Sequence, residues 1–306
     1  MNRLHHSFSG HLRLMQMSAT QLFVFVEGKQ CDPYFFAGVC SATLNQNVVY
    51  EICTSRQIPG GTGGKQALIA FFSFLRDRKS LISDLGGHRT GCLFFLDKDV
   101  DDLQGRRRRS RHVVYTQHYD VQNYVFEHGN LVTGASAAAS IDPRKIEAQF
   151  FDASGWCRQT ASLWRDWIAL CLRMLEDGVP CEANYRVLSP VQTRYCGPTD
   201  VSAHQALTRR LARRSGVPIS ELRQRIAMSL RKVDRYFAKG EHHRIFKGKW
   251  FAAILADNVD CIMAGDPYDG NRLSGRLLSA IAATLDFSEA WTEHFKQPLR
   301  DICAEL

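Results

Sequence analysis

Two short apolar runs that end abruptly in acid are the most informative part of the hydrophobic pattern. One is Phe-Val-Phe-Val-Glu-Gly at residues 23–28, and the other is Phe-Phe-Leu-Asp-Lys-Asp at residues 94–99. Runs that are apolar at every position are typical of central strands in a parallel sheet, which is buried on both faces. The acidic residues would then lie at the carboxyl edge, where open α/β sheets place their binding sites. Asp97 and Asp99 are two positions apart, so they project from the same face if the strand continues through them.

Strands and helices alternate through the first 130 residues. Asp32-Pro33 favours a helix start, and Gly86-Gly87 marks the end of a later helix. The predicted strands are residues 21–26, 47–53, 92–96 and 113–115, and the predicted helices are 32–44, 65–85 and 119–128. This alternation predicts an α/β fold with a parallel sheet flanked by helices on both sides. Residues 1–17 carry few cues and are expected to form a loose arm or a short leading strand.

Beyond residue 129 the alternation stops and helical patterns dominate. A small-residue connector is expected at 135–140, a helix start at Asp142-Pro143, and an isolated strand at 185–188. The remaining helices are predicted at 156–175, 201–215, 220–238, 250–263, 272–285 and 288–304. The pattern therefore predicts two domains, an α/β domain at 1–134 and a mostly helical domain at 135–306.

The acids at the two strand ends suggest a metal site. Three carboxylates at one sheet edge, those of Glu27, Asp97 and Asp99, would repel one another unless a cation lies between them. Hard oxygen ligands, with water in the remaining positions, suit Mg²⁺ or Mn²⁺. The alternative is that each acid only caps a strand or begins a loop. Taken singly, each acid fits that alternative, and only the spacing of the two acidic strand ends, which matches the family resemblance described below, favours the metal site.

The charge distribution indicates a polyanionic partner. The chain has a net charge of +8 and a pI near 9.0. Residues 200–250 hold thirteen Lys or Arg against four Asp or Glu, so the basic character is concentrated there. The alternative is an ordinary solvated helix surface or a face that docks an acidic protein. The basic residues expected to contact phosphates are Lys65, Arg106, Arg107, Arg108, Arg109, Arg209, Arg210, Arg213 and Arg214.

A glycine-rich stretch, a histidine pair and the cysteines bear on nucleotide binding, metal binding and disulfide formation. The glycine-rich stretch at 59–65 has Pro59 where a Walker A motif needs glycine and Gln66 where it needs Ser or Thr, so ATP binding is not expected. This stretch is either a flexible turn or a loop whose backbone N–H groups hold a substrate phosphate. His242-His243 has no metal-ligand partner at a recognisable spacing and is expected to make phosphate or surface contacts. The ten scattered cysteines include no Cys-x-x-Cys pair, which favours reduced thiols.

The acidic motifs resemble those of the Toprim fold found in topoisomerases, bacterial primases and overcoming-lysogenization-type nucleases. The resemblance spans about residues 18–130 and rests on Glu27-Gly28 and on Asp97-Lys98-Asp99. A weaker match lies at Gly248-Lys249. It implies general acid–base work for Glu27 and divalent metal binding by Asp97 and Asp99.

A second segment, Tyr-Asp-Val-Gln-Asn-Tyr-Val-Phe at residues 119–126, resembles the Tyr-x-x-Glu-Asn-Tyr stretch of a narrower Toprim-like group. That group includes the AriB effectors of the PARIS anti-phage defence systems. Gln122 stands where the group carries glutamate, which argues against a metal-ligand role at this position. Asp120 and Glu127 could supply the missing ligands, and Asn123 is expected to be a hydrogen-bonding support.

The resemblance implies a Mg²⁺- or Mn²⁺-dependent endonuclease that cleaves RNA, specifically tRNA, as a toxic effector in abortive infection. It also implies a partner ATPase of the ABC class, similar to AriA, that restrains the effector, and a homodimer when active. Because no apolar run approaches the length of a membrane span and no secretory signal is visible, a cytoplasmic protein without membrane contact is expected. Two alternatives are a catalytically silent Toprim-fold regulatory or binding subunit, which Gln122 favours, and a DNA nuclease of the overcoming-lysogenization type.

Overall fold

The computed structural model describes residues 7–59, 63–101, 103, 105, 107–148, 153–264, 270 and 272–306, with only the backbone described at 153 and 154. The chain divides into two compact units. The first, here called the sheet unit, comprises residues 1–98, 106–117 and 286–306. The second, the helical unit, comprises residues 99–105 and 118–285.

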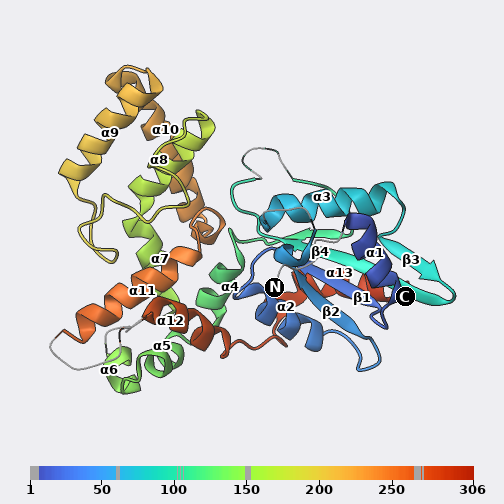
Figure 1. Ribbon diagram of the computed structural model, residues 1–306. Coiled ribbons are helices and arrows are strands. Elements are labelled where there is room, and N and C mark those ends of the chain that lie inside the picture. The colour runs from blue at the N-terminus through green and yellow to red at the C-terminus, as the bar shows by residue number, and fades with distance from the viewer. Residues whose placement is uncertain are drawn as a thin grey trace, which may run out of the picture. The chain divides into compact units, whose positions relative to one another are not determined.

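The sheet unit is built on a five-stranded, mostly parallel sheet (Figure 1). Its strands are β1 (Leu22–Val26), β2 (Tyr50–Thr54), β3 (Ile82–Leu85), β4 (His88–Leu96) and β5 (Val113–Tyr115). The order is β2-β1-β4-β3, with β5 also paired to β4. β1 is parallel to β2 and β4, β5 is parallel to β4, and β3 is antiparallel to β4. The predicted strands at 21–26 and 113–115 are confirmed, and the one at 92–96 is the second half of β4.

Helices cover both faces of this sheet. The helices of the unit are α1 (Phe8–Met17), α2 (Asp32–Ser41), α3 (Gly64–Asp77) and α13 (Glu293–Cys303), with 3₁₀ turns η1 (Ser55–Gln57) and η3 (Ala290–Thr292). On one face, α1 and α3 pack over Phe25 and Phe94, whose rings stack with centroids 4.7 Å apart. On the other face, Phe36 of α2 stacks on Phe95 at 4.3 Å, and Phe295 of α13 contacts both rings. The predicted α/β fold with a largely parallel, helix-covered sheet is confirmed.

The helical unit contains the remaining helices in the described part of the chain. They are α4 (Val121–His128), α5 (Leu131–Ala139), α6 (Pro143–Glu147), α7 (Ala153–Leu163), α8 (Arg165–Glu176), α9 (Val201–Ser215), α10 (Ile219–Ala238), α11 (Lys249–Ile262) and α12 (Leu273–Ala282), with the 3₁₀ turn η2 (His242–Arg244). Aromatic rings fill its core: Trp164 lies 5.2 Å from Trp250, and Phe246 lies 4.5 Å from Phe251, measured between ring centroids. The mostly helical character predicted for this part of the chain is confirmed.

The division into compact units differs from the predicted boundary between residues 134 and 135. The chain returns to the sheet unit at its end, because α13 buries the Phe295 side chain completely against the aromatic rings of α2 and β4. The helical unit also begins earlier, with α4 inside it.

Two segments predicted to lack helix are helical. Residues 8–17 form α1, because Phe8, Leu12 and Met15 share a helical face that packs on the sheet core and Ser7 caps the start. Residues 131–139 form α5 in place of the predicted connector. A Cβ at Gly134 would lie 2.4 Å from an Ile281 side-chain atom of α12. The small residues that suggested a linker therefore let two helices approach closely, and alanine itself favours the helix.

Three other predictions in the pattern were wrong. The helix predicted at 65–85 ends at Asp77, and Ile82–Leu85 is a strand of a hairpin whose turn residues Gly86 and Gly87 both have positive φ, at 62° and 83°. The helix predicted at 156–175 is two helices, because the backbone breaks at Trp164, with φ −104° and ψ 10°. Residues 185–188 form turns and not a strand.

No helix in the described part of the chain combines the length and apolar character needed to cross a membrane.

Candidate functional site

Two of the three predicted acids follow neighbouring strands of the sheet unit. Glu27 comes directly after β1, and Asp97 comes directly after β4. β1 and β4 are parallel with Val26 opposite Phe95, so both acids lie at the carboxyl edge of the sheet. Asp97 is 2% exposed, and Glu27 is half-buried. Their oxygen donors suit a hard divalent cation.

The turn after β1 is held by Asp32 and Ser55. The backbone N–H of Gly28 donates to Asp32 Oδ2 at 2.5 Å, and the Ser55 hydroxyl donates to the Glu27 carbonyl at 2.8 Å. A Cβ at position 28 would lie 2.5 Å from Asp32 Oδ1, so the Glu-Gly pair needs glycine for this close approach. Asp32 is the first residue of α2, and its side chain fixes the loop that carries Glu27.

Asp99 does not extend the strand that precedes it. β4 ends at Leu96, and Asp99 has a left-handed backbone with φ 49°. Its N–H donates to the Tyr119 carbonyl at 2.8 Å, and both residues belong to the helical unit. Because the strand stops first, the two-residue spacing does not place Asp97 and Asp99 on one strand face. The gathering of all three carboxylates around one cation stays a prediction.

The basic residues predicted in the sheet unit lie in two places. Lys65 is in the first turn of α3, and the N–H of Gly64 before it donates to Ser55 Oγ at 2.7 Å. Arg107, Arg108 and Arg109 are exposed. The Arg107 guanidinium lies 5.4 Å from the Tyr115 ring centroid, and the Arg108 N–H donates to the Tyr115 hydroxyl at 3.0 Å. Arg106 lies outside the described residues.

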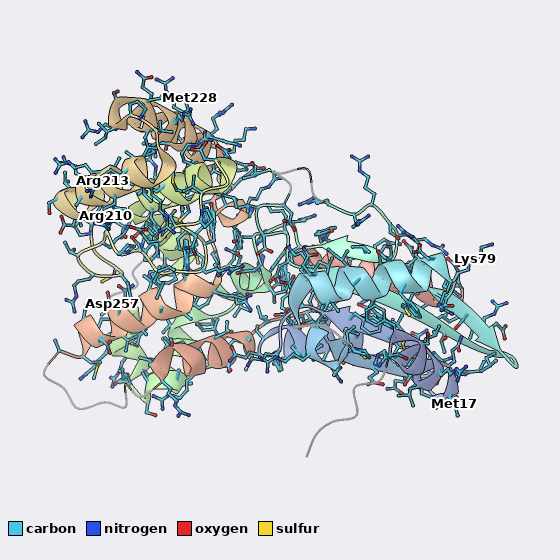
Figure 2. All side chains as sticks on the ribbon, turned by 45° about the horizontal axis from the view of Figure 1, so that its top comes forward. Met17, Lys79, Arg210, Arg213, Met228 and Asp257 are labelled. Carbon is cyan, nitrogen blue, oxygen red and sulfur yellow. The ribbon has the colours of Figure 1, made fainter. Side chains whose placement is uncertain are left out.

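The four predicted arginines of α9 divide into two pairs. Arg209 and Arg213 line an open hollow of about 620 Å³ beside the turn at 216–219. Arg210 and Arg214 both face Glu182, at 3.2 Å and 3.8 Å from its carboxylate oxygens. Figure 2 labels Arg210 and Arg213 on this helix. All four are exposed, but only the first pair is clear of this carboxylate.

A second basic hollow lies at the end of α10. Its volume is about 280 Å³, and its lining residues are Lys232, Arg235, Tyr236, Lys239, Glu241 and Arg244. The turn at Gly240, with φ 72°, brings Arg244 back towards Tyr236, with its guanidinium 5.8 Å from the ring centroid. The basic character of residues 200–250 was evident from the sequence, but the turn beside this hollow was not.

Asp120 and Asn123 organise the start of α4. The Asp120 carboxylate accepts the Asn123 N–H at 3.3 Å, and the Asn123 amide oxygen accepts the Asp120 N–H at 3.2 Å. The Asn123 amide nitrogen donates to the Phe246 carbonyl at 3.2 Å. Gly248 packs directly on this cap, since a Cβ there would lie 2.3 Å from both Asn123 N and Asp120 Oδ1. These contacts explain Asp120 and Asn123 by a structural role at the start of α4. Gln122, between them in the sequence, is buried.

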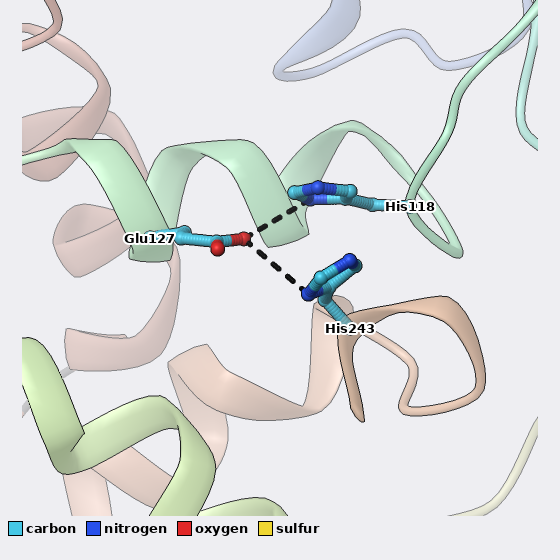
Figure 3. A group of neighbouring side chains, drawn as sticks. All are labelled: His118, Glu127 and His243. Atoms are coloured by element: carbon cyan, nitrogen blue, oxygen red, sulfur yellow. Dashed lines mark ion pairs between the residues drawn. The ribbon is translucent and has the colours of Figure 1, made fainter. Parts of the chain in front are cut away.

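Glu127, the third predicted support residue, faces two histidines whose rings lie next to each other (Figure 3). Its Oε2 atom is 3.2 Å from His118 Nδ1 and 3.9 Å from His243 Nδ1. Burial raises the pKa of Glu127 to about 7. The ligand atoms of these three residues lie within 4.8 Å of one another, so the group could hold a metal ion. It is called the His–Glu–His group below.

The contact of His243 with Glu127 was not part of the expectation of surface or phosphate contacts for His242-His243. The spacing along the chain did not indicate this group, because His118 precedes α4 and Glu127 lies in its last turn, whereas His243 lies in η2, more than 100 residues later. His242 is buried, and burial lowers its pKa to about 4.

A further trio among the described residues combines Cys196, Asp257 and Cys261 within the same 4.8 Å limit. The two sulfurs are 4.0 Å apart, and the Cys196 N–H donates to Asp257 Oδ2 at 3.0 Å. Burial, with the Asp257 carboxylate next, raises the pKa of Cys196 to about 12, which keeps this thiol protonated at neutral pH.

The chain matches no protein-family model, and no curated protein matches it. We therefore infer the function from the chemistry of the residues at these sites. The carboxyl edge of the sheet offers oxygen ligands, the His–Glu–His group offers nitrogen and oxygen ligands, and the basic hollows of the helical unit offer cations for phosphates.

Proposed function

We propose that the chain is a Mg²⁺-dependent nuclease of the Toprim type that hydrolyses phosphodiester bonds of RNA. Glu27 and Asp97 are its central groups, and Asp99 is the third acid. The observation that carries the proposal is that Glu27 and Asp97 each follow one of two neighbouring parallel strands at the carboxyl edge of the sheet. The hydrogen bonds from Gly28 to Asp32 and from Ser55 to the Glu27 carbonyl hold this loop in a defined conformation, which supports a functional role for Glu27.

The roles of the acids follow from their chemistry. A divalent ion, when bound, neutralises phosphate charge and lowers the pKa of a water ligand. Asp97 and Asp99 would hold that ion through carboxylate oxygens. Glu27 would accept the proton of the attacking water as the new phosphorus–oxygen bond forms. The bond to the leaving oxygen breaks in the same displacement, and a proton is returned to that oxygen.

The basic hollows of the helical unit support an extended polyanionic substrate. Arg209 and Arg213 on α9 and the basic residues at the end of α10 can contact successive phosphates without reading bases. RNA as substrate, and tRNA in particular, rests on the resemblance at residues 119–126. The same resemblance underlies our proposal of a toxic role in anti-phage defence, restraint by an ABC-type ATPase, and a homodimeric active form.

The test is cleavage of end-labelled total tRNA by the purified chain, with Mg²⁺ or with EDTA. Wild type is expected to cleave only with Mg²⁺. Glu27→Gln and Asp97→Asn are each expected to lower the rate by about 100-fold or more, since they remove a proton acceptor or a metal ligand. Glu51→Gln, at an exposed carboxylate on β2, is the matched control and should cleave like wild type.

A supercoiled plasmid incubated in parallel separates the two nucleic acids. Nicked plasmid beside intact tRNA would replace RNA with DNA in the proposal. Cleavage of tRNA that is equal for wild type and both acid variants would rule out the assigned groups.

A further inference from the structure

The His–Glu–His group has donor atoms at distances that suit a tetrahedral metal ion. With metal–ligand bonds of about 2.0–2.1 Å, neighbouring donors in a tetrahedral site lie about 3.3 Å apart. His118 Nδ1 and Glu127 Oε2 are already 3.2 Å apart. His243 Nδ1 is 3.9 Å from the same oxygen, so this pair must close by roughly 0.6 Å. Glu127 is 36% exposed and can make that adjustment by rotating its side chain.

Contacts outside the group hold its members in place. The His118 ring stacks on Tyr124, with ring centroids 3.9 Å apart and planes within 6°. The Tyr119 N–H donates to the His243 carbonyl at 2.8 Å, which ties the turn carrying His243 to the chain next to His118. Glu127 projects from the last turn of α4, whose first turn is fixed by the Asp120 cap. Ligand positions that are set before binding reduce the cost of ordering them when a metal binds.

A divalent cation accounts for the meeting of two histidines with one carboxylate. The two imidazole rings lie 3.9 Å apart between centroids and face the same oxygen. Two protonated rings at that distance would repel each other. A divalent cation uses the lone pairs of both neutral rings together with the negative charge of Glu127.

We infer that His118, Glu127 and His243 form a binding site for a borderline divalent metal of the Zn²⁺ class. Two imidazole nitrogens and one carboxylate oxygen match the ligands of Zn²⁺ and are a poor set for Mg²⁺, which takes oxygen. Three protein ligands leave a fourth position for water, and the partial exposure of Glu127 gives access to it. The site belongs to the helical unit alone and does not depend on the proposed nuclease chemistry.

The test is titration of the full chain with Co²⁺ as a spectroscopic substitute for Zn²⁺, under reducing conditions. Excess Mg²⁺ occupies oxygen-ligand sites during the titration, so the carboxylate edge does not contribute. Wild type is expected to bind one equivalent with the intense visible bands of tetrahedral Co²⁺, and added Zn²⁺ should abolish them. Glu127→Gln and His243→Gln are each expected to weaken binding at least 10-fold. His204→Gln, a half-buried histidine on α9, is the matched control and should bind like wild type.

Cys261→Ser separates this site from the Cys196–Asp257–Cys261 trio. The tetrahedral bands should persist in Cys261→Ser, whereas their loss there, or a thiolate charge-transfer band that accounts for all bound Co²⁺, would overturn the inference. Wild-type affinity in both Glu127→Gln and His243→Gln would overturn it as well.

A thermal measurement covers the case in which a variant folds poorly. Zn²⁺ should raise the melting temperature of wild type, because a metal that binds only the folded state stabilises it. The absence of both a Zn²⁺-induced shift and tetrahedral bands in wild type would contradict the site without recourse to any variant. Neither readout uses RNA cleavage, so failure of the nuclease proposal would leave this result interpretable.

Discussion

Gly248 is a position in the helical unit where an added Cβ is expected to destabilise the fold. Its backbone has φ −60° and ψ −31°, a conformation open to any residue, so the requirement for glycine is one of space. A Cβ there would lie 2.3 Å from the backbone nitrogen of Asn123, 2.3 Å from Asp120 Oδ1 and 2.8 Å from the carbonyl carbon of Gln122. Two of these three atoms are backbone and cannot rotate away.

The expected cost of Gly248→Ala is about 3 kcal/mol. Overpacking a fixed site costs about 1–3 kcal/mol, and contact with backbone atoms places this case in the upper part of that range. Displacing the Asp120–Asn123 cap adds about 1 kcal/mol. For a unit of this size, the loss corresponds to a fall in melting temperature of roughly 6–12 °C.

The assay is thermal and urea unfolding of the full chain, followed by far-ultraviolet circular dichroism. Gly275→Ala in α12 is the matched control, because a Cβ at Gly275 meets nothing within 4 Å and alanine favours a helix by up to about 1 kcal/mol. We expect Gly275→Ala to be as stable as wild type or slightly more stable. If Gly248→Ala melted with the control, the close packing of residue 248 on the α4 cap would be refuted.

Two further predictions test other parts of the molecule. Phe295→Ala should destabilise the sheet unit by about 3–5 kcal/mol in urea unfolding, because the ring is fully buried and contacts Phe35 and Phe95; a loss below about 1 kcal/mol would contradict the place of α13 on the sheet. His242 has its pKa lowered by burial from 6.5 to about 4, so between those values the unfolded state binds a proton that the folded state does not. Stability should therefore fall by about 2 kcal/mol as the pH drops from 6.5 to 5. His242→Gln should lose that part of the pH dependence, and identical pH profiles for the two proteins would count against the buried neutral histidine.

The parallel strands were predictable because their signal is local. Continuous apolar runs such as Phe23–Val26 are too short for a helix and too apolar for an exposed strand, and the acids that follow mark the edge. The hairpin was missed because Ile82 continues the helical spacing of α3, and Gly86-Gly87 ends a helix as readily as it forms a tight turn. A local pattern cannot choose between these outcomes without the pairing of β3 to β4.

Local sequence patterns have the same limit for the candidate sites, because they do not show which distant residues meet. Glu27 and Asp97 could be identified because the rule for parallel strands places their carboxyl ends at one edge, whichever contacts form later. His243 could not be joined to His118 and Glu127, because that meeting depends on how a turn packs against α4 and on no spacing along the chain. The assignment of α13 to the sheet was likewise hidden, since its aromatic contacts are with residues near the start of the chain.

Anomalous diffraction from Mn²⁺-soaked crystals of the wild-type chain would show whether the carboxyl edge of β1 and β4 holds the divalent ion of a hydrolytic site. Asp97 should ligate that ion beside Glu27, so we expect an anomalous peak within about 2.5 Å of an Asp97 carboxylate oxygen. Crystals that bind Mn²⁺ elsewhere, with no peak at the carboxyl edge of β1 and β4 at saturating metal, would contradict it.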